Sequence, residues 1–166
     1  MDHPDNFTQT DGKLHLSNLA QLELLRGMVE CGRPLLTSVR GFSMAPFIRD
    51  EDVLTIAPMN GHAPHVGEVV AFVQPDTGRL AIHRVIARVG PRWLVRGDNC
   101  PEADGVVPRR AILGVVIRVE RQGHAVRLGL GAEARLIAWL QRGHVLMRTV
   151  RIVRWVKRHW IVRRDQ

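Results

Sequence analysis

The sequence predicts a mainly β protein: a compact antiparallel β domain with a short N-terminal helix and a basic amphipathic C-terminal helix. Its 166 residues suit one domain with short appendages, and 45% hydrophobic with 24% charged residues is a globular composition. From residue 35 to residue 130, short apolar runs are separated by turn residues such as "PDTG" and "GDNCPEADG". Consecutive strands without helices between them indicate antiparallel pairing. We therefore divide the chain into residues 1–34, the β domain 35–130 and the tail 131–166.

The N-terminal part is expected to hold a polar lead and then a helix. Residues 1–14 are polar and acidic, which predicts a disordered lead and no secretory signal. Ser17 can cap a helix that runs to about Cys31, and "CGRP" ends it through Gly32 and Pro34. The apolar stripe of this helix comprises Leu19, Leu22, Leu25 and Met28. The stripe leaves two alternatives open, docking on the core or lying on a membrane.

The central region supplies the predicted strands. In chain order they are "LLTSV", "DVLTIA", "GEVVAFV", "LAIHRVIARV", "RWLVRG", "AILGVVIRVE" and "HAVRLGL". In the fourth run, Arg84 and Arg88 face one way and His83 faces the other. The residues expected on the same face as His83 are Ala81, Val85, Ala87 and Val89.

After "GLGAE" the apolar period becomes helical, and the charge becomes strongly positive. The whole chain has a net charge of +8, and residues 133–166 hold nine Arg or Lys against Glu133 and Asp165. One side of the helix gathers Val145, Ile152, Val153, Val156 and Trp160, and another gathers Arg148, Arg151, Arg154 and Arg158. Such a helix suits peripheral contact with an anionic membrane, or docking on the β core with its arginines in water. Nucleic acid is the weaker option, because the stripe contains no recognisable reading motif.

Cysteines, histidine pairs and apolar runs limit the remaining classes. Cys31 and Cys100 are too few for a disulfide framework, and neither belongs to a CxxC pair. His62 and His65 form an HxxH in the loop "NGHAPH", which we interpret as a solvated loop rather than a metal site. No metal or organic cofactor is implied. No run approaches the roughly 20 apolar residues of a spanning helix, so we expect a cytoplasmic protein or one peripheral at the membrane.

Three residue types point to nucleophilic chemistry. Ser43 in "GFSMAP" is either a nucleophile or a helix cap, and as a nucleophile it needs a base to take its proton. His83 lies on an apolar face that disfavours the charged imidazole, so it would stay neutral and accept a proton, although a core histidine is the simpler interpretation. A base also needs a carboxylate partner. The loop "RGDNCPEADG" offers Asp98, Glu102 and Asp104, each of which could equally be a turn former.

Five ordered motifs together resemble the signal peptidase family, which shares its catalytic core with the repressor-cleaving peptidases. They are "GFSMAP" at 41–46, "GEVVAFV" at 67–73, "IHRVI" at 82–86, "RGDNCPEAD" at 96–104 and "ILGVV" at 112–116. The resemblance covers roughly residues 35–120. It implies the compact antiparallel β fold of the signal peptidase and repressor-peptidase type, and a serine endopeptidase that cleaves a precursor or leader peptide after small residues.

The resemblance also implies roles for single residues. Ser43 is the expected nucleophile, and His83 stands where the bacterial leader-peptidase branch has a lysine base. A histidine there is similar to the branch of archaea and the endoplasmic reticulum. In that branch the aspartate six residues beyond the GDN aspartate orients the histidine, which maps to Asp104, with Asp98 as a supporting carboxylate. Ser43 attacks, His83 moves the proton and Asp104 orients the imidazole in this scheme.

The sequence departs from the family in three respects. Many relatives have a serine where this chain has Gly41, so backbone N–H groups, including those of Ser43 and Gly41, are expected to form the oxyanion hole. Cys100 replaces a polar residue of the GDN loop, and the usual spanning helix has no counterpart. In the family the substrate lies extended along a strand edge, and Met44 and Ile82 are expected to line its pockets.

Two other functions compete with the endopeptidase. The first is a non-catalytic peptide-binding module of the same fold in a peptide-maturation pathway, for which Gly41 and the missing spanning helix leave room. The second is a self-cleaving, repressor-like regulator. Residues 1–34 are too short for the DNA-binding domain that the second function requires, so we rank it last.

Overall fold

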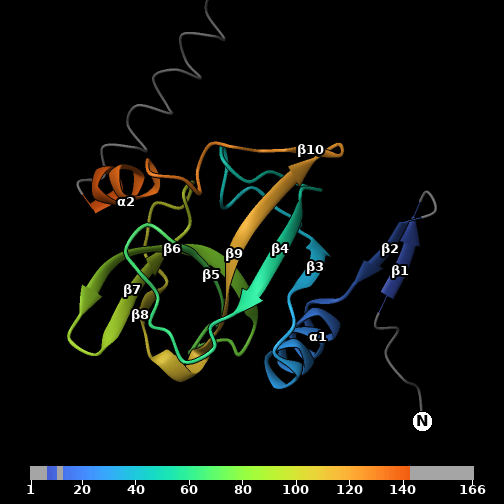
Figure 1. The fold of residues 1–166 in the computed structure, drawn as a ribbon, viewed down its shortest axis with the longest axis horizontal. Helices are drawn as coiled ribbons and strands as arrows, with labels where there is room; N and C mark the ends of the chain where they lie inside the picture. The colour runs from blue at the N-terminus through green and yellow to red at the C-terminus, as the bar shows by residue number, and fades with distance from the viewer. Residues whose placement is uncertain (1–6, 11–12, 143–166) are drawn as a thin grey trace, which may run out of the picture.

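The computed structural model describes residues 7–10 and 13–142, and these form an antiparallel β structure with helices at its sides. Figure 1 shows α1 (Asn18–Cys31) and α2 (Ala134–Arg142) at opposite sides of the main sheet. The prediction of a mainly β, antiparallel structure is confirmed. Among the described residues, no helix is long and apolar enough to cross a membrane.

The strands of the main sheet follow the predicted runs closely. They are β3 (Leu35–Ser38), β4 (Val53–Pro58), β5 (Val69–Val73), β6 (Leu80–Val89), β7 (Arg92–Arg96), β8 (Gly105–Val107), β9 (Ile112–Arg121) and β10 (His124–Ala125). Their order in the sheet is β3-β4-β9-β5-β6-β7-β8, with β10 added to β9. A 3₁₀ turn at Arg109–Ala111 leads into β9. The short β8 was missed by the sequence analysis because it begins directly after the acidic loop. The run predicted over "HAVRLGL" is a strand only at its first two residues.

The centre of the sheet is buried on both faces. In β5 the side chains of Val69 and Ala71 belong to one apolar cluster, and those of Val70 and Phe72 belong to another. Successive side chains of a strand point to opposite faces, so a continuous apolar run fits a strand that is covered on both sides. This arrangement makes β5 and its neighbours β6 and β9 a rigid base for the residues that β6 presents.

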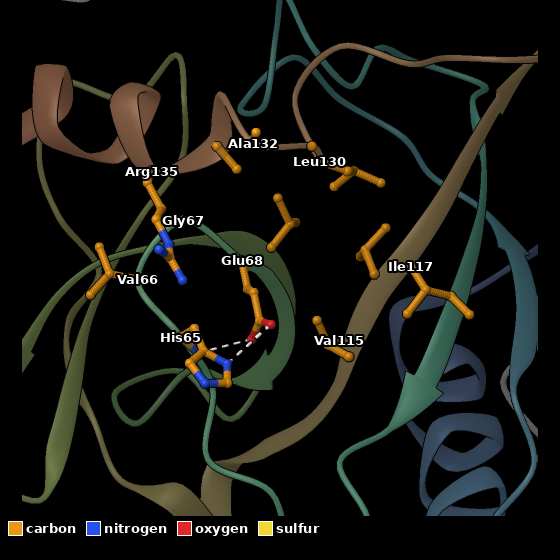
Figure 2. A pocket seen from close by; sticks show the side chains of 13 residues that line it. His65, Val66, Gly67, Glu68, Val115, Ile117, Leu130, Ala132 and Arg135 are labelled. Atoms are coloured by element: carbon orange, nitrogen blue, oxygen red, sulfur yellow. Dashed lines mark hydrogen bonds and ion pairs between the residues drawn. The ribbon is translucent and has the colours of Figure 1, made fainter.

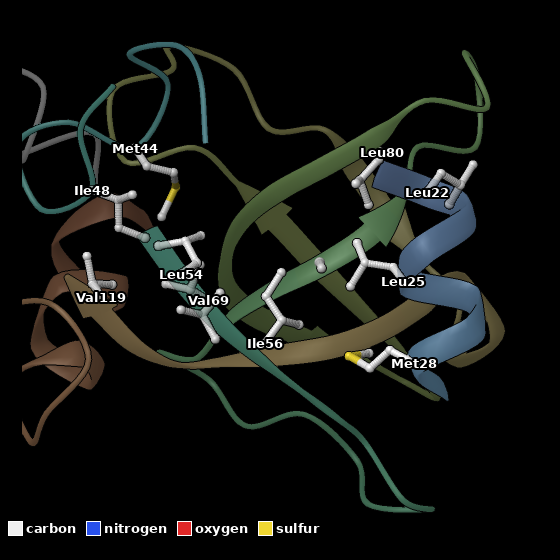
Figure 3. Packing of buried hydrophobic residues seen from close by; sticks show 12 residues of the cluster. Leu22, Leu25, Met28, Met44, Ile48, Leu54, Ile56, Val69, Leu80 and Val119 are labelled. Atoms are coloured by element: carbon white, nitrogen blue, oxygen red, sulfur yellow. The ribbon is translucent and has the colours of Figure 1, made fainter. Parts of the chain in front are cut away.

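Helix α1 (Asn18–Cys31) packs on one of these clusters. The Ser17 hydroxyl accepts a hydrogen bond from Ala20 N (3.2 Å), and Gly32 ends the helix with φ +64°. Both ends were predicted. Leu22, Leu25 and Met28 of α1 belong to the apolar cluster drawn in Figure 3, together with residues of β4, β5 and β9, so the helix docks on the core. The predicted stripe is wrong at Leu19, which is 53% exposed, because Ala20 takes the buried position of that turn.

Two terminal predictions are corrected or limited by the structure. The lead 1–14 was expected to be disordered, but β1 (Phe7–Thr10) and β2 (Lys13–Leu16) pair as antiparallel strands. The sequence signal was the Asp-Gly dipeptide between them, a common hairpin turn that the sequence analysis passed over. At the other end, α2 (Ala134–Arg142) begins directly after "GLGAE", as predicted. The amphipathic faces assigned to Val145–Trp160 lie outside the described residues.

Candidate active site

A histidine–aspartate pair is the central feature of the site. Strand β6 carries His83, and the residue before β8 is Asp104. His83 Nδ1 and Asp104 Oδ2 are 2.6 Å apart, and their side chains are 10% and 11% exposed. The other oxygen of Asp104 accepts a hydrogen bond from Gln74 Nε2 (2.9 Å), and the Thr77 hydroxyl donates to Gln74 Oε1 (3.0 Å). Both oxygens of the Asp104 carboxylate therefore have partners, and this fixes its orientation toward the imidazole.

The second aspartate of the same loop has a different partner. Asp98 accepts hydrogen bonds from Arg84 Nε (2.8 Å) and Arg84 Nη2 (2.7 Å), and both side chains are fully buried. Arg84 follows His83 on β6, so the two side chains leave the strand on opposite faces, as predicted. The sequence left open whether Asp98 or Asp104 contacts His83, and in the structure it is Asp104.

Arg84 is the centre of a buried polar cluster that the sequence analysis did not identify. Its Nη1 donates to the carbonyl oxygens of Gly67 and Gly129, each at 2.7 Å, and its guanidinium lies 5.6 Å from the centroid of the Phe47 ring. The Gln141 amide of α2 donates to the same Asp98 oxygen as Arg84 Nε. An arginine inside the apolar run "IHRVI" was the available signal, since a buried charge requires a partner. The cluster ties β6, the GDN loop and α2 together.

Ser43 lies in the loop between β3 and β4. The chain from Ser43 to Phe47 forms turns and not a helix, so Ser43 caps no helix here. The GDN loop holds this segment through two bonds: Asn99 N donates to Ser43 O (2.7 Å), and Asn99 Nδ2 donates to Phe42 O (3.1 Å). Within the described residues, the Ser43 hydroxyl and the Ser43 N–H have no hydrogen-bond partner.

The far side of the same loop is held by an ion pair. Asp52 accepts from Arg121 Nε (2.8 Å) and Nη2 (2.7 Å), and also from Arg49 N (2.8 Å). Burial opposes ionisation of Asp52, but the bonds from Arg121 and Arg49 outweigh it and lower the pKa of this carboxyl. Arg121 Nη2 also donates to Phe47 O (3.1 Å), so β9 anchors the segment that carries Ser43.

Gly97 allows the nucleophile candidate and the base candidate to approach each other. A Cβ atom on Gly97 would lie 2.8 Å from Ser43 O, 3.1 Å from His83 Nε2 and 2.6 Å from Cys100 Sγ. Only glycine fits at such a close approach. The Cys100 thiol therefore belongs to the site as well, and burial, together with the nearby Asp104 charge, raises its pKa. The sequence analysis named the GDN aspartate and left the role of this glycine unrecognised.

Ser43 and His83 line one groove of about 520 Å³. Met44 and Ile82, the predicted pocket residues, also line it. Met44 is mostly covered by the core, and its Sδ accepts from Asp98 N (3.4 Å). It therefore supports the floor of the groove rather than projecting into it.

The predicted oxyanion donors have different surroundings. Gly41 has φ +105°, and its N–H donates to Asp50 Oδ1 (2.7 Å). That donor is therefore engaged within the loop. The Ser43 N–H has no partner among the described residues, and it belongs to the same turn as the Ser43 hydroxyl. Ser43 N is accordingly the better placed of the two candidates to bind a developing negative charge.

A larger pocket of about 620 Å³ lies elsewhere, between β9 and the start of α2. Figure 2 shows His65 and Glu68 on one wall, and Arg135 reaching toward them from α2. His65 N donates to Glu68 Oε2 (2.8 Å), and His65 Nδ1 is 3.3 Å from Glu68 Oε1. Neither Ser43 nor His83 lines this pocket, so we place the candidate site in the smaller groove. In the described part of the chain, no three His, Cys, Asp or Glu side chains are arranged to hold a metal.

Comparison with known proteins does not assign a function to this site. No protein-family model matches the sequence, and no curated protein matches it either. The features that bear on function are the contacts of Ser43, His83 and Asp104, the groove that Ser43 and His83 line, and the sequence motifs that contain these residues.

Proposed function

We propose that this protein is a serine endopeptidase of the signal peptidase type, which cleaves a precursor or leader peptide after small residues. The observation that carries the proposal is the largely buried pair of His83 and Asp104, with His83 lining the same groove as Ser43. In this mechanism Ser43 Oγ attacks the scissile carbonyl carbon. His83 Nε2 takes the hydroxyl proton and returns it to the leaving amine, while Asp104 orients the ring and stabilises its charged form.

The position of Asp104 beside His83 Nδ1 supports this division of roles. A carboxylate at Nδ1 favours the ring form with the proton on Nδ1, and this leaves Nε2 as the acceptor. Nε2 is the atom that faces the Ser43 segment across Gly97. The hydroxyl and Nε2 are not hydrogen-bonded to each other in this structure, and catalytic hydrogen bonds of this kind often tighten only when the substrate binds.

Among the described residues, one edge of β6 is unpaired before Arg84, and this supports an extended peptide substrate. Val85 N donates to Glu68 O on the β5 side (2.8 Å). Bonding alternates along an antiparallel ladder, so Ile82 turns its N–H and C=O to the opposite side. There β7 pairs with β6 only from Arg84 onward. A peptide strand could therefore pair with Ile82 and lie beside Ser43, which is binding by strand addition.

The test is peptide cleavage by the wild type and by three variants. We would incubate a diverse peptide library with wild type, Ser43→Ala, His83→Ala and Asp104→Asn, and identify new termini by mass spectrometry. Cuts after small residues that the first two variants lack, and that Asp104→Asn makes far more slowly, are the expected result. Wild-type cleavage that survives in either Ser43→Ala or His83→Ala would remove the role assigned to that residue.

A second candidate is a non-catalytic peptide-binding module of the same fold. The engagement of Gly41 N–H with Asp50 favours it, because losing one oxyanion donor costs roughly 10²–10³ in rate. Peptides that bind wild type and Ser43→Ala equally, and that neither protein cuts, would support this module. Turnover by wild type would exclude it.

We also propose peripheral contact between α2, together with the basic tail, and an anionic membrane. On α2 the side chains of Leu136 and Trp139 are 57% and 64% exposed, and Arg135 and Arg142 are exposed beside them. Exposed apolar side chains flanked by arginines suit the surface of an anionic bilayer. Sedimentation with vesicles containing phosphatidylserine, lost with phosphatidylcholine alone and weakened in Trp139→Ala, is the expected result. Equal binding to both vesicle types would refute the electrostatic part.

A further inference from the structure

We propose that the groove beside Ser43 selects peptides with an acidic side chain about four residues from the bond presented to Ser43, and that Arg79 and Arg40 recognise that side chain. The inference rests on the proposed function, because it names the substrate class of the same site. It adds a charge requirement to the preference for small residues at the cut.

The charged side chains that line the groove are arginines. Arg40 enters it from the loop before Ser43, and Arg79 enters it from the turn before β6. No Asp or Glu is among the described residues that line it. In the part of the chain that the structure describes, neither guanidinium forms a hydrogen bond or an ion pair. Two unpaired cations along one groove attract an anionic side chain and repel a cationic one.

None of the neighbouring carboxylates among the described residues forms an ion pair with these arginines. Asp50 is near Arg40 in sequence, but one of its oxygens accepts the Gly41 N–H (2.7 Å). Asp76 belongs to the same turn as Arg79, and it is exposed outside the groove. Asp104 is partly buried and bonds to His83 and Gln74. No described carboxylate is paired with either guanidinium, so an acidic side chain of a bound peptide can complement both.

Asn18 determines where the peptide meets Arg79. Asn18 Nδ2 donates to Leu80 O (2.9 Å), and Leu80 N donates to Asn18 Oδ1 (3.0 Å). One side-chain amide thus occupies both backbone groups of Leu80, as a neighbouring strand would. Pairing along the free edge is available at Ile82 and stops at Leu80. Arg79 is four residues from His83, about 13 Å along an extended chain.

The peptide backbone consequently leaves the edge beside Arg79. A side chain about four residues from the scissile bond reaches the guanidinium there, whereas residues nearer to the bond face Ile82 and Met44. An exposed ion pair is worth about 0.2–1 kcal/mol. We therefore expect each arginine to contribute up to about five-fold in affinity, and the pair together to produce a clear preference for Glu over Gln.

The experiment separates binding from turnover. Fluorescein-labelled peptides of Ala, Ser, Gly and Val would carry a single Glu, Gln or Lys at each position in turn. Fluorescence anisotropy would measure their affinity for Ser43→Ala, and mass spectrometry would measure cutting by wild type. We expect Glu to bind several-fold more tightly than Gln, with Lys weakest, and the preference to peak about four residues from the wild-type cut. Roughly 1 M salt should remove it, because the screening length falls to about 3 Å.

Matched variants identify the residues responsible. Arg40→Ala and Arg79→Ala together, in the Ser43→Ala background, should abolish the difference between Glu and Gln peptides. Arg92→Ala changes the net charge by the same amount per site, is exposed and does not line the groove, so it should retain the preference. Arg79→Glu should invert it in favour of Lys.

The outcomes distinguish this inference from the proposed function. Wild-type cleavage with equal rates for Glu and Gln peptides would retain the endopeptidase and overturn the acidic selectivity. Selective binding of Glu peptides to Ser43→Ala without any wild-type cleavage would retain the selectivity and overturn the endopeptidase. A preference that persists unchanged in the double arginine variant would show that other residues cause it, and the inference would fail.

Discussion

The buried pair of Arg84 and Asp98 should be far more important for folding than a surface pair of the same length. Arg84 Nη2 and Asp98 Oδ2 are 2.7 Å apart, with both side chains 0% exposed. Arg118 Nε and Glu120 Oε1 are also 2.7 Å apart, but these side chains are 58% and 30% exposed. We compare Arg84→Met with Arg118→Met, which remove the same charge at the same distance from a carboxylate.

The expected magnitudes follow from what each substitution leaves behind. Arg84→Met leaves the Asp98 carboxylate buried with only the Gln141 amide, and leaves two carbonyl oxygens without their donor. Breaking such a pair costs about 3–5 kcal/mol. Arg118→Met leaves a carboxylate that water can solvate, so its expected cost is below about 1 kcal/mol. The free energy of unfolding of a domain of this kind is about 5–15 kcal/mol, so only Arg84→Met is expected to approach unfolding.

Urea unfolding followed by circular dichroism at pH 7 measures both costs. With a slope of about 2 kcal/mol/M, Arg84→Met should lower the midpoint by about 1.5–2.5 M, and Arg118→Met by less than about 0.5 M. The double variant Arg84→Met with Asp98→Leu should recover much of the loss, because an apolar pair needs no solvation. Similar costs for the two single variants, or no recovery in the double variant, would refute the reasoning.

Three further predictions concern the loops around the site. Burial opposes ionisation of Asp52, but Arg121 lowers the pKa of this carboxyl. The ion pair therefore stabilises the fold above the unfolded pKa of about 3.8, and this stabilisation is lost as the pH falls below that value. In acid unfolding, Asp52→Asn should lack this pH-dependent loss of stability. Burial and Asp104 raise the pKa of the Cys100 thiol, so iodoacetamide should label it slowly at pH 8, and Asp104→Asn should accelerate the labelling, as mass spectrometry of the labelled peptide would show. Gly97→Ala should abolish cleavage and cost about 1–3 kcal/mol in thermal unfolding, since its Cβ would lie 2.6 Å from Cys100 Sγ; an active Gly97→Ala would contradict the close approach.

Much of the fold could be predicted because the signals are local. Three examples are the alternation of buried and less buried residues in β4, the continuous apolar run of β5 and the helix cap at Ser17. Each depends on neighbours a few residues away in the sequence. The errors occurred where a local signal was ambiguous. Leu19 and Ala20 both suit an apolar stripe, and only the way in which α1 packs on the rest of the protein determines that Ala20 is covered and Leu19 is exposed.

The candidate site was predictable in its residue types and not in its pairings. Asp98 and Asp104 lie six residues apart in one loop, and both are acids that could hold a histidine. The path of the loop decides between them: it brings Asp104 to His83 and Asp98 to Arg84 on the other face of β6. Gln74, which bonds to Asp104 across thirty positions of sequence, has no local signal at all.

The sequence by itself determined the strands, the first helix and the presence of a serine, a histidine and an acidic loop, because each depends on short-range periodicity, turn chemistry and motif order. Tertiary structure alone decided three features: the bonds of Asp104, the buried arginine cluster, and the groove whose edge Asn18 closes. These features depend on which distant segments come into contact when β6 packs between β5 and β7. The free energy of apolar burial that drives this packing comes from the whole core and not from any one motif.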